Sequence, residues 1–202
     1  MDILVATNNK HKLIEIKQIF ELEFSNKFNW LTSKDLTSEK FEVDETGSTF
    51  AENSKIKAIE YFNKFKIPTI ADDSGLIVDQ LGGQPGVHSA RYSGENATDV
   101  SNRNLIKFRL ATIGVQESSA RFVCVMTYYD GQNIIQSEGV CEGKIIDHEK
   151  GANGFGYDPL FIPDGYDKTF AELDSDIKNK ISHRSAAIRN LVEILKKEKF
   201  NS

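Results

Sequence analysis

The chain has little cysteine and proline, no long apolar run and no excess of positive charge, and each absence excludes a class of protein. Two cysteines and four prolines among 202 residues exclude a disulfide-framed miniprotein and a collagen-like chain. No apolar run approaches the roughly 20 residues that cross a bilayer, so no membrane partner is expected. Because 25 Lys and Arg residues face 30 Asp and Glu residues, the net charge is −5, which disfavours nucleic acid as a partner.

The remaining composition, 39% hydrophobic and 27% charged, is typical of a globular protein. The length predicts a single domain over residues 1–202, built as two closely joined lobes without a clear linker. The first residues show no basic segment before an apolar one and no cleavage signature, so we expect a cytoplasmic protein. Cys124 and Cys141 lie in apolar stretches and are expected as reduced core thiols, with a single disulfide as the alternative.

Short apolar runs alternate with helical periodicity, a pattern that predicts an α/β fold. Residues 3–6 form a continuously apolar run, as expected of a buried strand. The polar residues 7–12 then form a strand-to-helix turn. Thr49 and Glu52 form a capping box at the start of a second helix, which we expect to end at Pro68.

The middle of the chain is predicted to return to strands. Residues 69–71 form a short strand that leads into a turn at 72–75, and residues 76–81 form the next strand. Residues 82–94 are rich in glycine and are predicted to form a loop, and residues 98–113 a helix.

The last part combines a hairpin with a helix. Residues 120–129 and 133–142 predict two strands joined across Asp130-Gly131. A glycine-rich loop follows at 151–159, and a last helix begins near Ser182. The whole pattern favours an elongated mixed sheet with flanking helices, in which two lobes share one long sheet.

A candidate phosphate cradle lies at the first strand-to-helix turn. Helix-start N–H groups together with Lys10 and Lys12 suit a phosphate, although no GxxxxGK[ST] loop is present. The alternative is a capped helix with two solvated lysines.

Candidate metal ligands lie at Asp72-Asp73, after a short buried strand. Two adjacent carboxylates there are costly without compensation, and hard oxygen ligands suit Mg²⁺. The structural alternative is an Asx turn capped by Asp72. Asp44 and Glu45, just before the capped helix, are a second but weaker acidic signal.

A candidate base pocket lies in the second glycine-rich loop. Phe155 and Tyr157 offer flat faces for a base, and Asp158 could accept hydrogen bonds from its edge. A flexible loop with one anchoring aromatic is the alternative. Lys178 and His183-Arg184 oppose the dipole of a helix start, which suggests an anionic or carbonyl-bearing ligand. A solvated basic face is the plain alternative. Together these clusters predict a Mg²⁺-dependent enzyme that acts on a nucleotide.

Several long motifs, in order and over nearly the whole chain, resemble those of the inosine/xanthosine triphosphate pyrophosphatases. They are Thr7-Asn8-Asn9-x-x-Lys12, Glu45-Thr46-Gly47 with Thr49-Phe50-x-Glu52-Asn53, Ala71-Asp72-Asp73-Ser74-Gly75-Leu76, Leu81-Gly82-Gly83-x-Pro85-Gly86, Ser89-Ala90-Arg91-Tyr92-Ser93-Gly94, Gly154-Phe155-Gly156-Tyr157-Asp158-Pro159 and Ile181-Ser182-His183-Arg184. The chain departs from many members at Asn8, where they carry glycine or serine.

The resemblance implies Mg²⁺-dependent hydrolysis of ITP, dITP and XTP to the monophosphate and pyrophosphate, by a homodimer with a nucleotide cleft between two lobes. It implies that Asp73 activates water and contacts Mg²⁺, with Glu45, or else Asp44, as a further metal ligand. The implied substrate-binding residues are Thr7, Asn8, Asn9, Lys10, His11, Lys12 and Lys57 for the triphosphate, Ser74 beside the substrate, and Phe155, Gly156, Tyr157, Asp158, Lys178, His183 and Arg184 for the purine.

Two other functions stay open at this point. A non-catalytic nucleotide-binding module would have the same pocket, but binding alone does not need the costly Asp72-Asp73 pair. A pyrophosphatase for modified pyrimidine or standard nucleotides would share the phosphate chemistry and differ in its substrates.

Overall fold

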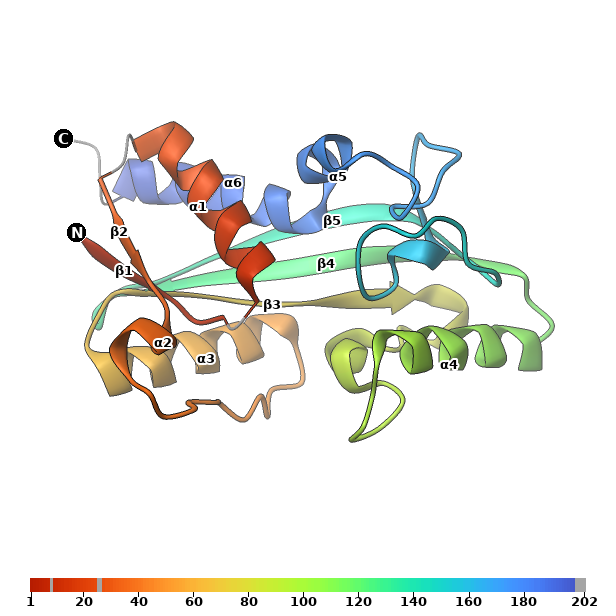
Figure 1. The fold of residues 1–202 in the computed structure, drawn as a ribbon, viewed down its shortest axis with the longest axis horizontal. Coiled ribbons are helices and arrows are strands. Elements are labelled where there is room, and N and C mark those ends of the chain that lie inside the picture. The colour runs from red at the N-terminus through yellow and green to blue at the C-terminus, as the bar shows by residue number, and fades with distance from the viewer. Residues whose placement is uncertain (8, 25–26, 199–202) are drawn as a thin grey trace. The chain divides into compact units, whose positions relative to one another are not determined.

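The computed structural model describes residues 1–7, 9–24 and 27–198, and Figure 1 shows the arrangement of their helices and strands. The helices and strands are β1 (Asp2–Val5), α1 (Lys10–Phe24), β2 (Asn29–Leu31), α2 (Ser33–Leu36), α3 (Phe50–Phe65), β3 (Thr69–Val78), α4 (Asp99–Thr112), β4 (Glu117–Tyr129), β5 (Ile134–Ile146), β6 (Phe161–Pro163), α5 (Ser175–Ile181) and α6 (His183–Glu198). Among the described helices, none combines the length and the apolar character that crossing a membrane requires.

The strands form one mixed sheet in the order β2-β1-β3-β4-β5-β6. β1 pairs in parallel with β2 and with β3, whereas β5 and β6 are antiparallel. The long strands β4 and β5 are neighbours joined through Asp130, whose N–H donates to the carbonyl oxygen of Asn133 at 3.4 Å. The predicted α/β fold with a mixed sheet, flanking helices and a central hairpin is therefore confirmed.

The chain divides into two compact units, and β3, β4 and β5 each contribute residues to both. The first unit comprises residues up to Asp73, the segment Cys124–Gly139 and the segment from His183, and the second comprises Ser74–Val123 and Val140–Ser182. The assignment of residues 1–202 to one domain stays a prediction.

In the first unit, helices cover both faces of the sheet. Strand alternation directs Ile3 and Val5 into a cluster with α1 and α6, whereas Leu4 packs in a cluster with Ala58 and Tyr61 of α3. Figure 1 accordingly shows α1 and α6 on one side of β1 and β3 and α3 on the other. The predicted buried strand is thus confirmed, with bounds one residue earlier at Asp2–Val5, and residues 3–6 are at most 3% exposed.

In the second unit, α4 contributes Ile106 and Leu110 to a cluster that includes Leu76 of β3. Phe122 and Phe161 add an edge-to-face pair, with their ring centroids 4.7 Å apart. This core supports the glycine-rich loop before β6. Both cysteines are free and buried, Cys124 in the first unit and Cys141 in the second, which confirms the prediction of reduced core thiols.

The main correction concerns residues 72–75, which lie inside β3 and not in a turn. The Asx-turn interpretation of Asp72 is therefore wrong as well. The strand continues because its alternation directs the two carboxylates to opposite faces of the sheet, where each finds hydrogen-bond donors.

Smaller corrections concern element ends and short elements. The strand predicted at 76–81 ends at Val78 and continues as a 3₁₀ turn. The capping box at Thr49 is present, but α3 ends at Phe65, where Lys66 caps it in the left-handed conformation (φ 57°), before Pro68 is reached. The short elements α2, β2, α5 and β6 were not predicted, because a few residues carry too little periodicity.

Candidate active site

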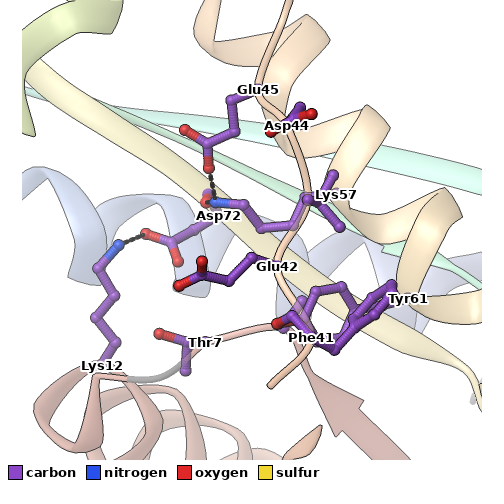
Figure 2. A pocket seen from close by; sticks show the side chains of 11 residues that line it. Thr7, Lys12, Phe41, Glu42, Asp44, Glu45, Lys57, Tyr61 and Asp72 are labelled. Atoms are coloured by element: carbon purple, nitrogen blue, oxygen red, sulfur yellow. Dashed lines mark hydrogen bonds and ion pairs between the residues drawn. The ribbon is translucent and has the colours of Figure 1, made fainter. Parts of the chain in front are cut away.

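A pocket of about 310 Å³ lies in the first unit, beyond the carboxyl end of β1. This is the position at which α/β proteins commonly bind ligands. The pocket is lined by Ala6, Thr7, Lys12, Phe41, Glu42, Val43, Asp44, Glu45, Lys57, Tyr61 and Asp72. Figure 2 shows Lys12 and Lys57 directed at Asp72 from opposite sides.

Lys57 joins the acidic groups of the pocket. Its ammonium donates to the backbone oxygen of Asp72 at 2.9 Å and forms an ion pair with Glu45. Burial by itself lowers the pKa of Lys57, but the charges of Asp72 and Glu45 outweigh it and raise the pKa above its ordinary value. Lys57 is therefore protonated, and its positive charge lies among the carboxylates that line the pocket.

Asp72 is the buried carboxylate at the centre of this arrangement, and it is 2% exposed. Its Oδ2 atom accepts a hydrogen bond from Lys12 of α1 at 2.7 Å and lies 3.8 Å from Nε of Arg184. Arg184 in turn donates to Glu15 at 3.1 Å. Burial opposes ionisation, yet the cations of Lys12, Arg184 and Lys57 hold the pKa of Asp72 well below its ordinary value. Asp72 is thus ionised and serves to hold the surrounding cations.

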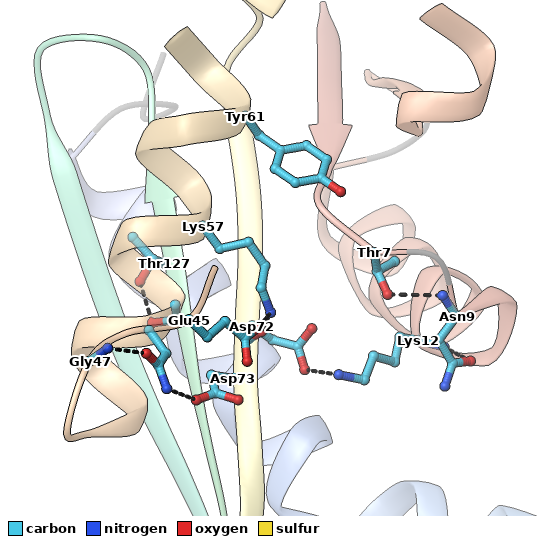
Figure 3. Close-up of polar contacts among 12 residues, drawn as sticks. Thr7, Asn9, Lys12, Glu45, Gly47, Lys57, Tyr61, Asp72, Asp73 and Thr127 are labelled. Atoms are coloured by element: carbon cyan, nitrogen blue, oxygen red, sulfur yellow. Dashed lines mark hydrogen bonds and ion pairs between the residues drawn. The ribbon is translucent and has the colours of Figure 1, made fainter. Parts of the chain in front are cut away.

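Asp73 points to the opposite face of β3, toward α3. Its Oδ2 atom accepts a hydrogen bond from Asn53 at 3.0 Å, and Oδ1 of Asn53 accepts the backbone N–H of Gly47 at 2.7 Å (Figure 3). Burial raises the pKa of Asp73, the Asn53 hydrogen bond opposes the shift, and the nearby charges of Glu45 and Asp72 add to it. The net result is a carboxyl group that is more basic than an ordinary aspartate.

The local sequence explains how the Asn53 bridge is held. A Cβ at position 47 would lie 2.6 Å from Cβ of Glu52 and 2.7 Å from Oδ1 of Asn53, so only glycine fits there. Thr49 accepts the N–H of Glu52, and Glu52 accepts the N–H of Thr49, which fixes the first turn of α3. The residues from Glu45 to Asn53 therefore hold the Asn53 side chain in the position from which it donates to Asp73.

The candidate metal ligands supply hard oxygen atoms. Asp44 is exposed, whereas Glu45 is half-buried. Within the part of the chain that the structure describes, no three His, Cys, Asp or Glu side chains gather as a metal-binding group. This donor set fits Mg²⁺, which usually takes one or two protein carboxylates and completes its shell with water and substrate phosphates.

The predicted phosphate cradle falls partly within the described residues. The backbone N–H of Asn9 donates to Oγ1 of Thr7 at 3.1 Å, and Lys12 lies in the first turn of α1. Asn8 lies outside the described residues, as do the side chains of Lys10 and His11. Of the predicted cradle, Thr7 and Lys12 line the pocket.

The second unit brings Phe155, Asp158 and Lys178 together. Lys178 donates to Oδ2 of Asp158 at 2.5 Å, and its ammonium lies 4.7 Å from the ring centroid of Phe155. Oδ2 of Asp158 also accepts the N–H of Phe155 at 2.8 Å. A Cβ at Gly154 would lie 2.2 Å from that oxygen atom, so glycine is required for the loop to close around the carboxylate.

The other predicted substrate-binding residues are placed differently. Tyr157 is buried, and its hydroxyl donates to the backbone oxygen of Ser89 at 2.7 Å, so its ring belongs to the core. Ser74 is half-buried in β3. Lys178 lies within α5 and not at a helix start, whereas His183 and Arg184 do begin α6 and belong to the first unit.

Some residues of the pocket were not predicted. Phe41, Glu42 and Val43 come from a segment without regular structure, and Phe41 is held by an edge-to-face contact with Tyr61, at 4.9 Å between ring centroids. The alternation of apolar and acidic residues from 41 to 44 is the one signal that could have indicated an extended, half-buried segment.

The fold and the pocket define an α/β protein in which lysines and carboxylates surround a cavity at the end of a parallel strand pair. The model of the Ham1 family matches residues 3–194, and the chain belongs to this family.

Relatives match along almost the entire chain. A dITP/XTP pyrophosphatase of Aquifex aeolicus is 42% identical, with 97% of each chain covered, and one of Caldanaerobacter subterraneus is 44% identical, with 96% of each covered. Among solved structures, the Ham1 protein of Staphylococcus aureus has a TM-score of 0.87 at 38% identity and covers 98% of this chain and 100% of its own. A HAM1 protein of Coxiella burnetii has a TM-score of 0.88 at 35% identity, with 98% and 99% covered. The resemblance read from the motifs is therefore confirmed.

Proposed function

We propose that this protein hydrolyses the non-standard purine nucleoside triphosphates dITP, XTP and ITP to the nucleoside monophosphate and pyrophosphate. The observation that carries the proposal is the pocket of the first unit, in which Lys12 and Lys57 contact a buried acidic strand. The names of the relatives, dITP/XTP pyrophosphatases of similar length, support the same substrates.

The lysines and the start of α1 bind the triphosphate in this proposal. Lys12 and Lys57 supply two positive charges, and Thr7 and Asn9 lead into the helix start, where backbone N–H groups suit an anion. Asn8, Lys10 and His11 belong to the same proposed cradle. The phosphate oxygens of the bound substrate then also contact Lys12 and Lys57, which pair with Asp72 and Glu45 in the structure.

The proposed base-binding groups are Phe155, Gly156, Asp158 and Lys178 of the second unit, with Tyr157 as an anchor of their loop. Phe155 is 43% exposed and offers a flat face, while Lys178 can donate to a 6-keto oxygen that adenine lacks. Ser74 is proposed to lie beside the substrate, and His183 and Arg184 are proposed to contact the purine, as the resemblance implies. A buried polar set of this kind rejects a base whose edge leaves its groups unpaired.

Asp73 is the proposed general base. Asn53 fixes one of its oxygen atoms, and this holds the carboxylate in place to take the proton of a water molecule attacking the α-phosphorus in line. Glu45, or Asp44, together with Asp73 would hold Mg²⁺. When bound, the ion neutralises charge on the phosphates and orients them. Lys12 and Lys57 stabilise the charge that develops on the leaving pyrophosphate.

Pyrophosphate release from dITP, XTP, ITP, GTP and ATP, each with Mg²⁺ and with EDTA, tests this function. We expect metal-dependent release from the first three substrates only. Equal release from all five would refute the purine selectivity and favour a general pyrophosphatase. Saturable binding without release would favour a non-catalytic nucleotide-binding module.

The proposal extends to assembly and location. We expect a homodimer, as the resemblance to the pyrophosphatase family implies, and a cytoplasmic protein, because its substrates belong to the nucleotide pool. Light scattering of the full chain checks the first expectation, and a monomer over the assay concentration range would contradict it.

A further inference from the structure

The first two turns of α4 hold both backbone groups of a single loop residue. Oδ2 of Asp99 accepts the N–H of Gly156 at 2.7 Å, and Nη1 of Arg103 donates to the carbonyl oxygen of Gly156 at 2.9 Å. Asp99 and Arg103 are four residues apart and therefore share one face of the helix. Both contacts involve a charged side chain, which makes them stronger than ordinary hydrogen bonds.

Arg103 also forms an ion pair with Glu149, a residue close to the start of the loop. Its Nε atom contacts Oε2 of Glu149 at 3.0 Å, while Lys107, one turn further along α4, contacts Oε1 at 2.7 Å. The Arg103 side chain is only 12% exposed, so solvent screens these contacts weakly. Arg103 thus connects Glu149, two residues before the glycine-rich loop, with Gly156 inside it.

The loop that is held in this way is rich in glycine. Gly151, Gly154 and Gly156 all adopt positive φ angles, which few other residues tolerate. Gly156 stands between Phe155 and the anchored Tyr157, and Asp158 follows directly. Because the N–H and the carbonyl oxygen of Gly156 are both hydrogen-bonded to α4, the backbone here is fixed, and so are the directions of the neighbouring side chains.

We propose that Asp99 and Arg103 are positioning residues that order the loop from Gly154 to Asp158 for the purine base. This inference rests on the proposed function, which gives Phe155 and Asp158 to base recognition. If the loop is already ordered before the substrate arrives, binding does not have to supply the free energy that ordering the loop costs. Without the two contacts, substrate binding must also order the loop, so the affinity for the substrate falls. The rate of the reaction at the phosphates does not change.

Kinetics of Arg103→Ala and Asp99→Ala with dITP test the proposal. Each variant should raise KM about tenfold, the factor that corresponds to about 1.4 kcal/mol of binding free energy. The kcat should stay within about twofold of wild type, as expected when a contribution to uniform binding is lost. Asp99→Asn keeps an acceptor oxygen for the Gly156 N–H and should restore most of the affinity.

Lys107→Ala is the matched control. It removes the second ion pair of Glu149 on the same helix but leaves the Gly156 peptide untouched, so its KM should match wild type. Asp99 is exposed at the start of α4, so its substitution leaves the core of the unit intact even if Arg103→Ala were to fold poorly.

Hydrogen exchange of residues 151–158 gives a readout that does not depend on turnover. Exchange should rise in Arg103→Ala and Asp99→Ala by about tenfold, and not in Lys107→Ala. Unchanged KM and unchanged exchange in both variants, or a loss of kcat at constant KM, would overturn the positioning role while leaving the proposed function intact. Absence of dITP hydrolysis by the wild type would instead overturn the proposed function, and the base-positioning role with it.

Discussion

Replacing Lys12 by methionine should destabilise the protein, because it leaves the buried Asp72 carboxylate without its shortest side-chain contact. Asp72 is 2% exposed and the Lys12 side chain 20%, and their atoms lie 2.7 Å apart. Breaking a buried ion pair commonly costs about 3–5 kcal/mol. Since Arg184 stays 3.8 Å from the same oxygen atom, we expect a smaller loss of about 2 kcal/mol.

Lys144→Met is the control, because its ion pair with Glu117 has nearly the same length, 2.8 Å, but lies in solvent, with side chains 45% and 60% exposed. Such a pair contributes about 0–1 kcal/mol. By thermal unfolding at neutral pH, Lys12→Met should lower Tm by about 4–8 °C and Lys144→Met by only a few degrees. Equal shifts in the two variants would refute the argument from burial.

The pH dependence gives a second check on the same residue. The folded-state pKa of Asp72 is lowered from 3.8, so its ionisation adds stability above that pH, and the contribution is lost as the pH falls through the folded-state pKa. Without Lys12 the folded-state pKa rises, and the variant loses the contribution at a higher pH. The difference in unfolding free energy between wild type and Lys12→Met should therefore narrow in strong acid, and a constant difference would contradict this reasoning.

Further predictions concern close approaches and buried thiols. Gly47→Ala should lower kcat by at least about tenfold, measured on dITP, because the new Cβ displaces Asn53 from Asp73. Gly139→Ala should destabilise by about 3 kcal/mol in denaturant unfolding, because its Cβ would lie 2.1 Å from a backbone oxygen of α6. Cys124 and Cys141 are buried, and burial raises their pKa to about 12 and about 11, so mass spectrometry should find both unmodified by iodoacetamide until denaturant is added. The packing described would be contradicted by a wild-type kcat in Gly47→Ala or by wild-type stability in Gly139→Ala. Rapid alkylation of either cysteine in the folded protein would contradict it as well.

The sequence was most informative where a residue type has a local structural meaning. The apolar run at residues 3–6 and the Thr49–Glu52 capping box predicted β1 and the start of α3 correctly. It was misleading at Asp72-Asp73, where two carboxylates in succession favoured a turn. Their partners Lys12, Arg184 and Asn53 are distant in the sequence, and only tertiary contacts make a strand tolerate such residues.

For the candidate site, motifs indicated which residues matter but not what they contact. The Lys57 contact with Asp72 and the Asn53 bridge to Asp73 depend on how α3 lies against β3, which no spacing reveals. The burial of Tyr157 was not predicted either, since an aromatic residue beside glycines is compatible with a base stack or with a core anchor.

Hydrolysis of dITP in ¹⁸O-labelled water tests the central claim most directly, because the position of the label reports which phosphorus atom is attacked. The proposed in-line attack on the α-phosphorus predicts one labelled oxygen in dIMP, none in the pyrophosphate, and loss of this reaction in Asp73→Asn. Label in the pyrophosphate, release of single phosphates, or undiminished turnover by Asp73→Asn would contradict it.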